Sequence, residues 1–294
     1  MNDDGGLVLF FSGTLIALLL GVFLAIRPGP QRPDRDQFSN NKQRSVLQFR
    51  TNYPNLDRLA SLDPASKPYL NIVKLAVRKH ASTYQLDPLL VLALIKHESA
   101  YNLRAVSPVG AAGPMQFMPA TGRDMGLAPV YSPDLLQQAE QVKDRARSLY
   151  SRAVRKMQAE QFSLLPDLID RWKELNTRQR RLFTQYRRRL KQKIEDKSRQ
   201  QLADLDQRFL RKKAVLKGVK YLAELFAERN GDVRESLAAY NAGPGSVRRY
   251  NGIPPYNETV QYQNRIVNTY QRYSRYLQPD LERKDRVPAL SSVK

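Results

Sequence analysis

The sequence predicts a mainly α-helical protein in which a long helical hairpin is inserted between two helical segments, behind an N-terminal transmembrane helix. Three observations support this fold class. Apolar residues recur every three or four positions through most of the chain after residue 66, whereas the alternation typical of strands is nearly absent. One uninterrupted apolar run lies near the N-terminus. Hydrophobic residues make up 41% of the 294 residues, which is enough to build a folded core.

The composition excludes several kinds of chemistry. The chain has no cysteine and only two histidines, His80 and His97. Disulfide scaffolds, thiol nucleophiles and cysteine-ligated metals are therefore excluded, and a histidine-rich metal site is not expected. We predict that the protein needs no metal and no cofactor, and that carboxylates, hydroxyls, amides or the backbone carry its chemistry.

The N-terminal region 1–27 is predicted to be a transmembrane anchor. Its apolar run, residues 7–26, has no ionisable side chain and spans roughly 30 Å as a helix, the thickness of a bilayer core. A cleaved signal peptide fits less well, because Asp3 and Asp4 replace the basic start and no A-x-A site follows. Arg27 and later arginines on the carboxyl side favour a cytoplasmic location for the rest of the chain, although long domains can be translocated despite such charges.

Two polar segments are expected to lie outside the folded part. Residues 28–66 are interrupted by five prolines and are predicted to be a linker with at most short helices. Residues 279–294 are short and charged, and are predicted to be a flexible tail.

Residues 67–133 begin the globular part. Apolar residues recur at helical spacing from Leu70 onward, and Asp87 followed by Pro88 is a typical helix start. The helix that follows, up to Glu98-Ser99, is apolar on almost every face and is predicted to be buried. Residues 214–278 return to the same globular patterning after an intervening segment of different composition.

The intervening segment, residues 134–213, is predicted to be a basic, coiled-coil-like helical hairpin. Two apolar stripes in this segment step by three or four residues, and Ser163 and Pro166 lie between them. The first stripe consists of Leu135, Ala139, Val142, Ala146, Leu149, Ala153 and Met157. The second consists of Leu168, Trp172, Leu175, Leu182, Tyr186, Leu190 and Ile194, continuing through Leu202, Leu205 and Phe209.

Glu98 is the candidate catalytic residue. It ends the apolar helix and precedes a loop of small residues, Gly110–Gly113. A carboxyl group beside a hydrophobic helix loses hydration, which favours its protonated form. A carboxylic acid that keeps its proton near neutral pH is what protonation of a glycosidic oxygen requires. On spacing alone, an ordinary surface glutamate at a helix end is the alternative.

Three motifs follow one another along the chain. The first comprises Glu98-Ser99, Ser107, Gly110–Gly113, Met115-Gln116 and Met118-Pro119. The second is Ala239-Tyr240-Asn241-Ala242-Gly243, and the third contains Pro255-Tyr256, Glu258-Thr259 and Tyr262. Together they resemble the motifs of lytic murein transglycosylases. The resemblance covers about half of the chain and implies a lysozyme-like catalytic domain formed by residues 67–133 and 214–278. The chain departs from the pattern at Pro114, where many members have leucine, and in the inserted hairpin.

The resemblance implies cleavage of the β-1,4 bond between N-acetylmuramic acid and N-acetylglucosamine. Glu98 would protonate the leaving oxygen and then act as base on the C6 hydroxyl, which closes a 1,6-anhydro ring. No second carboxylate lies in the first motif, and a glycosidase lacking one needs help from its substrate. The N-acetyl oxygen of the sugar would supply that help.

The same resemblance gives roles to neighbouring residues. Ser107 and Gln116 would hydrogen-bond the sugar or its acetamido group, and Tyr240 would position or polarise Glu98. Met115 and Met118 either line saccharide subsites or fill the core. Asn241 is included among the substrate-binding residues, although an asparagine at this position supports a turn more readily than it contacts substrate. Glu258 either contacts substrate or forms a structural ion pair, and His97 is expected to be packing or surface rather than catalytic.

The expected partner is the peptidoglycan glycan strand, reached from the bacterial inner membrane by a single-pass protein whose catalytic domain is periplasmic. The chain has a net charge of +21, and the outer faces of the hairpin are heavily basic. This basic surface is either a solvated face or a surface for anionic polymers, membrane headgroups or an acidic protein. No nucleic-acid-binding motif is present, so no nucleic acid is expected. The alternatives to a transglycosylase are a hydrolase resembling goose-type lysozyme and a non-catalytic wall-binding adaptor.

Overall fold

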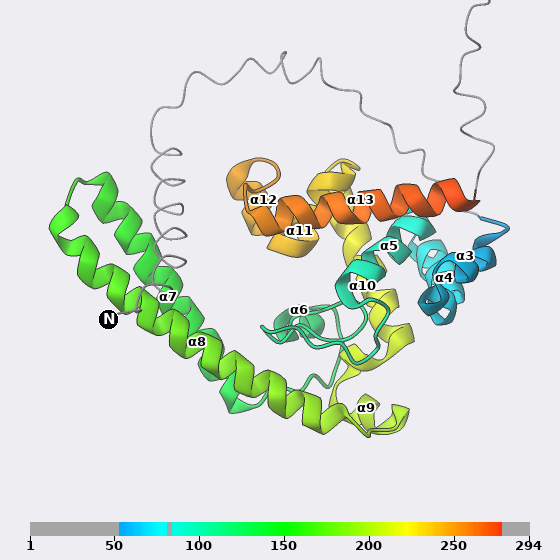
Figure 1. Cartoon of the computed structure of the whole chain (residues 1–294), viewed down its shortest axis with the longest axis horizontal. Coiled ribbons are helices and arrows are strands. Elements are labelled where there is room, and N and C mark those ends of the chain that lie inside the picture. Colours follow the sequence, from blue (N-terminus) through cyan, green and yellow to red (C-terminus); the bar gives the residue numbers. More distant parts are fainter. Residues whose placement is uncertain (1–52, 81–83, 278–294) are drawn as a thin grey trace, which may run out of the picture. The chain divides into compact units, whose positions relative to one another are not determined.

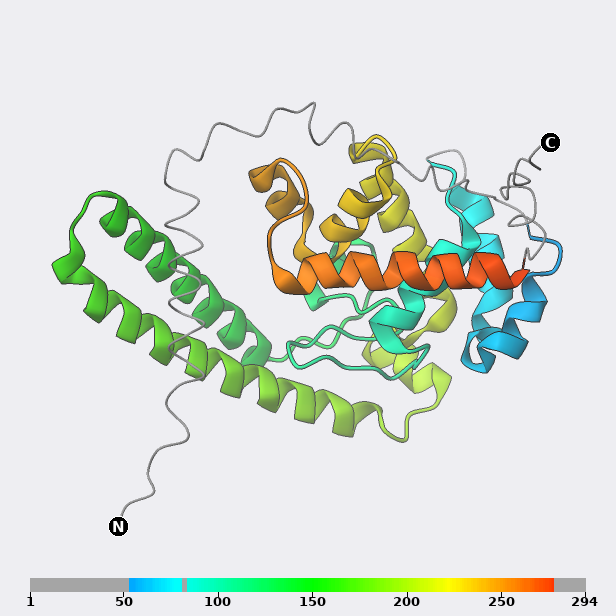
Figure 2. The same ribbon diagram turned by 45° about the horizontal axis from the view of Figure 1, so that its top comes forward.

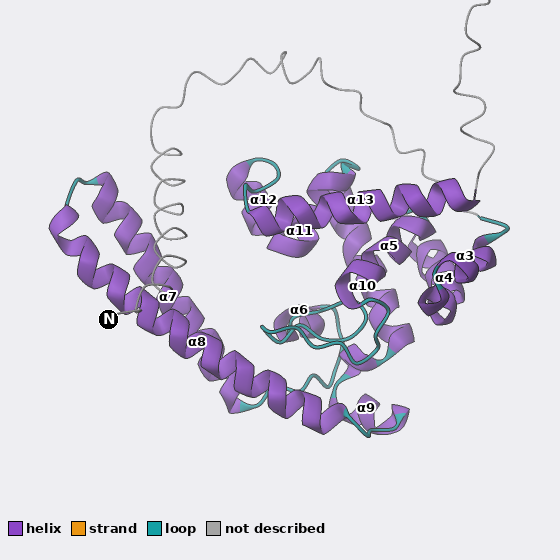
Figure 3. Ribbon diagram, viewed as in Figure 1, coloured by secondary structure: helices purple, strands orange, loops and turns teal. Residues whose placement is uncertain are grey.

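The computed structural model describes residues 53–80 and 84–277, and within these ranges every regular element is a helix (Figures 1 and 3). Within the described residues, β-type pairing is limited to two isolated bridges, which pair Ala112 with Val106 and with Phe117. The mainly helical class is therefore confirmed. The described residues separate into two compact units, which we call the hairpin unit, residues 138–180, and the main unit, residues 53–80, 84–137 and 181–277.

The main unit contains most of the helices. In chain order they are η1 (Leu56–Arg58), α3 (Leu59–Leu62), η2 (Pro64–Tyr69), α4 (Leu70–His80), α5 (Pro88–Ser99), α6 (Pro119–Asp124), α9 (Arg199–Leu205), η4 (Gln207–Phe209), α10 (Arg211–Glu228), α11 (Val233–Ala242), α12 (Pro244–Tyr250) and α13 (Asn257–Leu277). The C-terminal part of α8 (Leu165–Ile194) also belongs to this unit.

Helix α5 is the central element of the main unit. Every residue from Pro88 to Ile95 is buried, as the all-round apolar sequence predicts. The helix begins where the Asp87 carboxylate accepts a hydrogen bond from the Leu89 amide at 2.8 Å. It ends at Ala100, whose left-handed backbone turns the chain into the following loop. Helix α13 packs along α5, and α10 packs on α4 and α11 (Figure 2).

The structure differs from the expectation of a linker up to residue 66. Residues 56–69 form short helices, and Tyr53, Leu56 and Leu59 are buried. The Tyr53 hydroxyl donates a hydrogen bond to the Asp87 carboxylate at 2.7 Å, and the Asp63 carboxylate accepts one from Tyr273 at 2.5 Å. The folded part therefore starts earlier, because side chains in this proline-interrupted stretch cover the start of α5 and the side of α13.

The hairpin unit is built from α7 (Asp134–Gln158) and the N-terminal part of α8, joined through η3 (Phe162–Leu164). Apolar side chains of both stripes are buried, including Ala139, Val142, Ala146, Ala153 and Leu168. Tyr150 and the only tryptophan, Trp172, face each other with ring centroids 6.5 Å apart. These contacts pair the two helices along the stripes.

The second stripe does not continue as one helix to Phe209. Helix α8 ends at Ile194, and a separate helix, α9, begins at Arg199 after a capping box formed by Ser198 and Gln201. Residues 206–209 then turn into the core of the main unit, where Phe209 is fully buried. The predicted insertion, 134–213, is thus shared between the two units.

Two predicted segments lie outside the described residues: the transmembrane anchor, residues 1–27, and the tail, residues 279–294. Among the helices that the structure describes, none combines the length and the apolar character needed to cross a bilayer.

Candidate functional site

Glu98 lies in the last turn of α5 and is half-buried. Its carboxylate accepts a hydrogen bond from the hydroxyl of Tyr262, which is on α13. Burial raises the pKa of Glu98 from 4.5 to about 7, and the Tyr262 hydrogen bond offsets part of that rise. A carboxyl group with this pKa holds its proton in a large fraction of molecules at neutral pH, so it can serve both as an acid and as a base.

A second tyrosine, Tyr240, lies near Glu98, but its hydroxyl has a different partner from that of Tyr262. The Tyr240 hydroxyl, on α11, donates a hydrogen bond to the Met115 carbonyl at 3.0 Å rather than to Glu98. Burial and then the negative charge of Glu98 hold the pKa values of Tyr240 and Tyr262 well above 10. Both hydroxyls therefore keep their protons at neutral pH, and of the two it is Tyr262 that donates to the Glu98 carboxylate.

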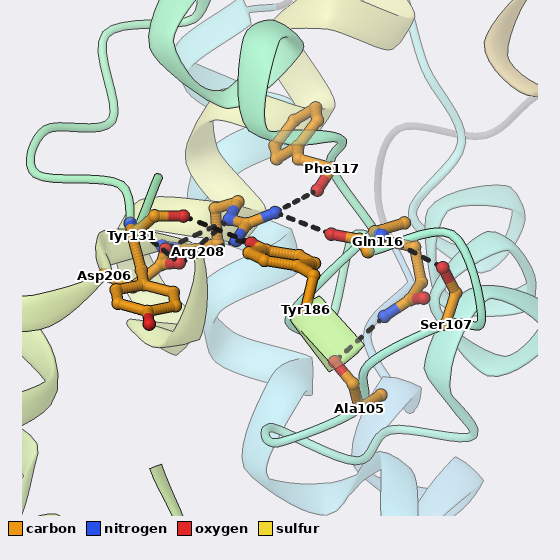
Figure 4. Close-up of polar contacts among 10 residues, drawn as sticks. Ala105, Ser107, Gln116, Phe117, Tyr131, Tyr186, Asp206 and Arg208 are labelled. Atoms are coloured by element: carbon orange, nitrogen blue, oxygen red, sulfur yellow. Dashed lines mark hydrogen bonds and ion pairs between the residues drawn. The ribbon is translucent and has the colours of Figure 1, made fainter. Parts of the chain in front are cut away.

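The loop between α5 and α6 carries the rest of the first motif. Gln116 has a left-handed backbone, and its amide donates hydrogen bonds to the carbonyls of Gly113 at 2.9 Å and Ala105 at 3.2 Å (Figure 4). The Ser107 hydroxyl accepts a hydrogen bond from the Ala111 amide at 2.9 Å. Both side chains thus brace the loop, and both remain partly exposed. The structure gives Gln116 and Ser107 a structural contact in addition to their predicted contact with sugar.

The two methionines of the first motif differ in their surroundings. Met115 is fully buried, and its side chain fills the space left by Gly218 on α10. Its side chain therefore lies in the core rather than in a saccharide subsite, which corrects the first of the two roles expected for Met115. Met118 is half-buried at the start of α6, where it retains some contact with solvent.

The remaining predicted site residues belong to α11 and α13. Asn241 accepts a hydrogen bond from the Thr259 hydroxyl at 2.8 Å, which ties the second motif to the third. Glu258 is exposed in the first turn of α13, and no ion pair of Glu258 occurs within the described part of the chain. The structural ion pair considered for Glu258 is therefore not formed there. His97 contacts the Thr269 hydroxyl at 2.7 Å and packs on α13, as the sequence favours.

A buried arginine from the segment after α9 holds the loop. Arg208 is fully buried, forms an ion pair with Asp206 at 2.7 Å, and donates hydrogen bonds to the carbonyls of Gly110 at 2.9 Å and Phe117 at 3.0 Å. It also donates to the Tyr186 hydroxyl of α8 at 3.0 Å (Figure 4). Every nitrogen of the guanidinium has a partner, which compensates for burying the charge.

Two glycines allow this close approach. A side chain at Gly113 would meet the Arg208 carbonyl at 1.9 Å, and one at Gly110 would meet the Tyr186 ring at 2.6 Å. Both glycines also have positive φ, at +76° and +89°. The small residues of the motif are thus required by the packing of residues 186 and 208 against the loop.

Sequence reasoning missed two residues of the site. Tyr262 is part of the third motif but was not expected to contact Glu98, and a helical α13 packed on α5 is what brings them together. Arg208 lies among many surface cations of the insertion, and only the neighbouring Asp206 distinguishes it in sequence. No group of three or more histidine, aspartate or glutamate side chains that could hold a metal ion occurs among residues 53–80 and 84–277.

Comparison with known proteins defines the class of this chain. It belongs to the transglycosylase SLT domain family, which matches residues 76–163 and 188–262, more than half of its length. The family match includes all three motifs and part of the hairpin.

Two relatives can be named. A protein described as "Transglycosylase" from Enterobacteria phage PRD1 is 45% identical over 53 residues, which are 18% of this chain and 20% of the phage protein. A structure of an inactive mutant of the lytic transglycosylase Slt from Pseudomonas aeruginosa is 20% identical, with a TM-score of 0.41, and the similarity covers 75% of this chain and 26% of that one. The chain thus spans about a fifth to a quarter of the relatives that it matches.

Proposed function

We propose that this protein is a peptidoglycan lytic transglycosylase with Glu98 as its single acid and base. Membership of the transglycosylase SLT domain family supports the activity. The contact between Glu98 and Tyr262 carries the proposal at the level of the site, because a desolvated carboxyl group with a pKa of about 7 is suited to give up and then take back a proton.

The reaction begins with the protonated carboxyl of Glu98 beside the glycosidic oxygen. Proton transfer to that oxygen releases the N-acetylglucosamine side and leaves positive charge at C1 of N-acetylmuramic acid. The carbonyl oxygen of the sugar's own acetamido group stabilises this charge, so no second carboxylate is needed. The deprotonated Glu98 then removes the proton of the C6 hydroxyl, whose oxygen bonds to C1 and closes the 1,6-anhydro ring without consuming water.

The neighbouring residues have supporting roles in this mechanism. Tyr262 donates to the Glu98 carboxylate and stabilises it between the two proton transfers. Tyr240 is held by the Met115 carbonyl, so its ring forms part of the wall beside the acid. The exposed parts of Ser107 and Gln116 orient the acetamido group, and Met118 borders the sugar. Asn241 lies near the end of α11 and Glu258 in the first turn of α13, where the exposed Glu258 carboxylate contacts substrate.

We extend the proposal to the fold of the main unit and to the location of the protein. The main unit is proposed to be a lysozyme-like catalytic domain. The apolar run at residues 7–26 anchors the protein in the inner membrane as a single-pass helix, and the catalytic part faces the periplasm, where its substrate is found.

The test is digestion of purified peptidoglycan by the wild-type protein and by Glu98→Gln, followed by mass spectrometry of the products. We expect 1,6-anhydromuramic ends from the wild type and a loss of activity of at least 100-fold in the variant. Reducing ends would instead identify a hydrolase, and absence of any cleavage would contradict the proposal and favour the non-catalytic wall-binding adaptor.

A further inference from the structure

A basic cavity lies where the C-terminal part of α8 passes the loop after α5. Its volume is about 460 Å³, within the usual range for a small-ligand site. Four cationic side chains and a single acidic one contribute to its lining, which consists of Arg104, Thr184, Arg187, Arg188, Lys191, Gln192, Ile194 and Glu195. All of these residues belong to the main unit.

The four cations of the cavity form no ion pair within the described part of the chain, where none of the pairs involves Arg104, Arg187, Arg188 or Lys191. Two of the guanidinium groups are instead fixed by backbone carbonyls: Arg104 donates to Lys197 at 2.6 Å and Arg187 donates to Val106 at 3.2 Å. A carbonyl orients a guanidinium without neutralising its charge, so these two groups are ordered and still carry full positive charge.

Like charges around one cavity repel each other, and the repulsion is relieved when an anion enters. A solvated surface disperses its cations, whereas this cavity gathers four of them around one space with Glu195 as the only acidic group in the lining. Ordered arginines match the planar, two-oxygen geometry of a carboxylate. The cavity is therefore suited to a small group bearing carboxylates.

The cavity shares a segment with the proposed sugar site. Arg104 and Val106 lie in the loop that continues through Ser107 to Gln116, and the Arg187 guanidinium binds that loop one residue before Ser107. We propose that the cavity binds carboxylates of the peptide stem carried by N-acetylmuramic acid, so that the enzyme recognises glycan strands whose stems are intact. This inference rests on the proposed function, because it takes peptidoglycan as the substrate.

The experiment measures binding, so that it does not require cleavage. Full-length Glu98→Gln protein in detergent is titrated with soluble glycan strands that carry peptide stems and with the same strands after an amidase has removed the stems. The test variant adds Arg188→Gln and Lys191→Gln, two exposed residues of the cavity. The matched control adds Arg181→Gln and Arg189→Gln, which remove the same charge from exposed positions of α8 outside the cavity lining.

Relative to the Glu98→Gln parent protein, we expect the cavity variant to bind peptide-bearing strands roughly five- to tenfold more weakly and to bind stripped strands with unchanged affinity. The control variant is expected to bind both kinds of strand as the parent does. Equal weakening for both kinds of strand, equal weakening by the control, or no weakening would overturn the inference. A parallel titration with poly(glycerol phosphate) separates a phosphate polymer from the stem. If only the phosphate polymer loses affinity in the cavity variant, the stem assignment is wrong.

Failure of the proposed function has a different signature. Wild-type protein would then cleave neither kind of strand, whereas the binding difference between the two kinds would still be measured with Glu98→Gln. If the parent binds neither kind of strand, the cavity does not recognise stems and the inference fails.

Discussion

At the scale of single residues, the hydrogen bond between Tyr262 and Glu98 is the central contact of the candidate site. The carboxyl is held at the end of a buried helix, which raises its pKa to about 7, and the phenol limits that rise by stabilising the charged form. These two opposing effects bring the pKa of Glu98 close to neutral pH, as the proposed acid and base roles require.

The raised pKa has a consequence for stability. In the unfolded chain the Glu98 carboxyl has its ordinary pKa of 4.5, so the folded state binds the proton more tightly. The contribution of Glu98 to the free energy of unfolding is therefore fully present below pH 4.5 and is lost as the pH rises through 7. We expect Glu98→Gln to be more stable than wild type by about 2 to 3 kcal/mol at pH 8 and nearly equal at pH 4, measured by urea unfolding.

The control for this prediction is Glu258→Gln, because Glu258 is exposed. It is expected to leave the pH dependence of unfolding as it is in wild type. If Glu98→Gln and wild type lose the same stability between pH 4 and pH 8, the carboxyl of Glu98 is not desolvated in the folded protein.

Tyr262→Phe tests the opposing effect. The hydrogen bond from Tyr262 lowers the Glu98 pKa, so its removal raises that pKa and keeps the acid protonated to higher pH. We expect the alkaline limb of the kcat/KM profile to move to higher pH while the maximal rate falls, because the carboxylate needed as base is less stable. Tyr250→Phe, at an exposed tyrosine, serves as the control and should leave the profile unmoved.

At the scale of elements, the loop after α5 depends on segments that are distant in sequence. Arg208 and Tyr186 occupy the space beside Gly113 and Gly110, and Tyr240 binds the carbonyl of Met115. The loop that bears Gln116 is therefore clamped from two sides, by the segment after α9 and by α11.

Gly113→Ala is expected to destabilise the protein by about 2 to 3 kcal/mol and to lower activity, because the added carbon would meet the Arg208 carbonyl at 1.9 Å with φ at +76°. Gly245→Ala provides the matched control, since nothing lies within 4 Å of its added carbon and its position is helical. Unfolding in urea measures both variants. Equal stability of the two would contradict the close contact between the loop and residue 208.

Arg208→Met is expected to cost about 3 to 5 kcal/mol, because it leaves the fully buried Asp206 carboxylate without its cation. Asp206→Leu should be similarly damaging, and the double variant should lose less stability than the sum of the two. A double-mutant cycle measured by thermal unfolding gives this coupling. Strict additivity would show that the ion pair is not formed.

At the scale of the whole molecule, the chain divides into two units, and its only tryptophan, Trp172, lies in the hairpin unit. Trp172 lines a hairpin cavity together with Tyr150, Ala146 and neighbouring polar residues, and few side chains of that unit are fully buried. Tryptophan fluorescence therefore reports on the hairpin unit, whereas far-ultraviolet circular dichroism reports on all helices.

We expect the fluorescence transition in urea to occur at a lower concentration than the main change in circular dichroism, because the hairpin unit has the smaller core. Trp172→Phe is the control, and it should abolish the fluorescence transition while leaving the circular dichroism of the main unit unchanged. Coincident transitions by the two methods would show that the units unfold together.

The sequence by itself determined the helical class and the burial of α5, because these depend on local periodicity. Its three motifs, by their resemblance to a known family, also indicated Glu98 as the candidate acid. The sequence also predicted both hairpin helices from their stripes. Only the tertiary structure decided that Tyr262, rather than Tyr240, donates to Glu98, that Met115 lies in the core, and that Arg208 holds the loop. These features depend on contacts between residues separated by about 90 or more positions, which the spacing of residues along the chain does not encode.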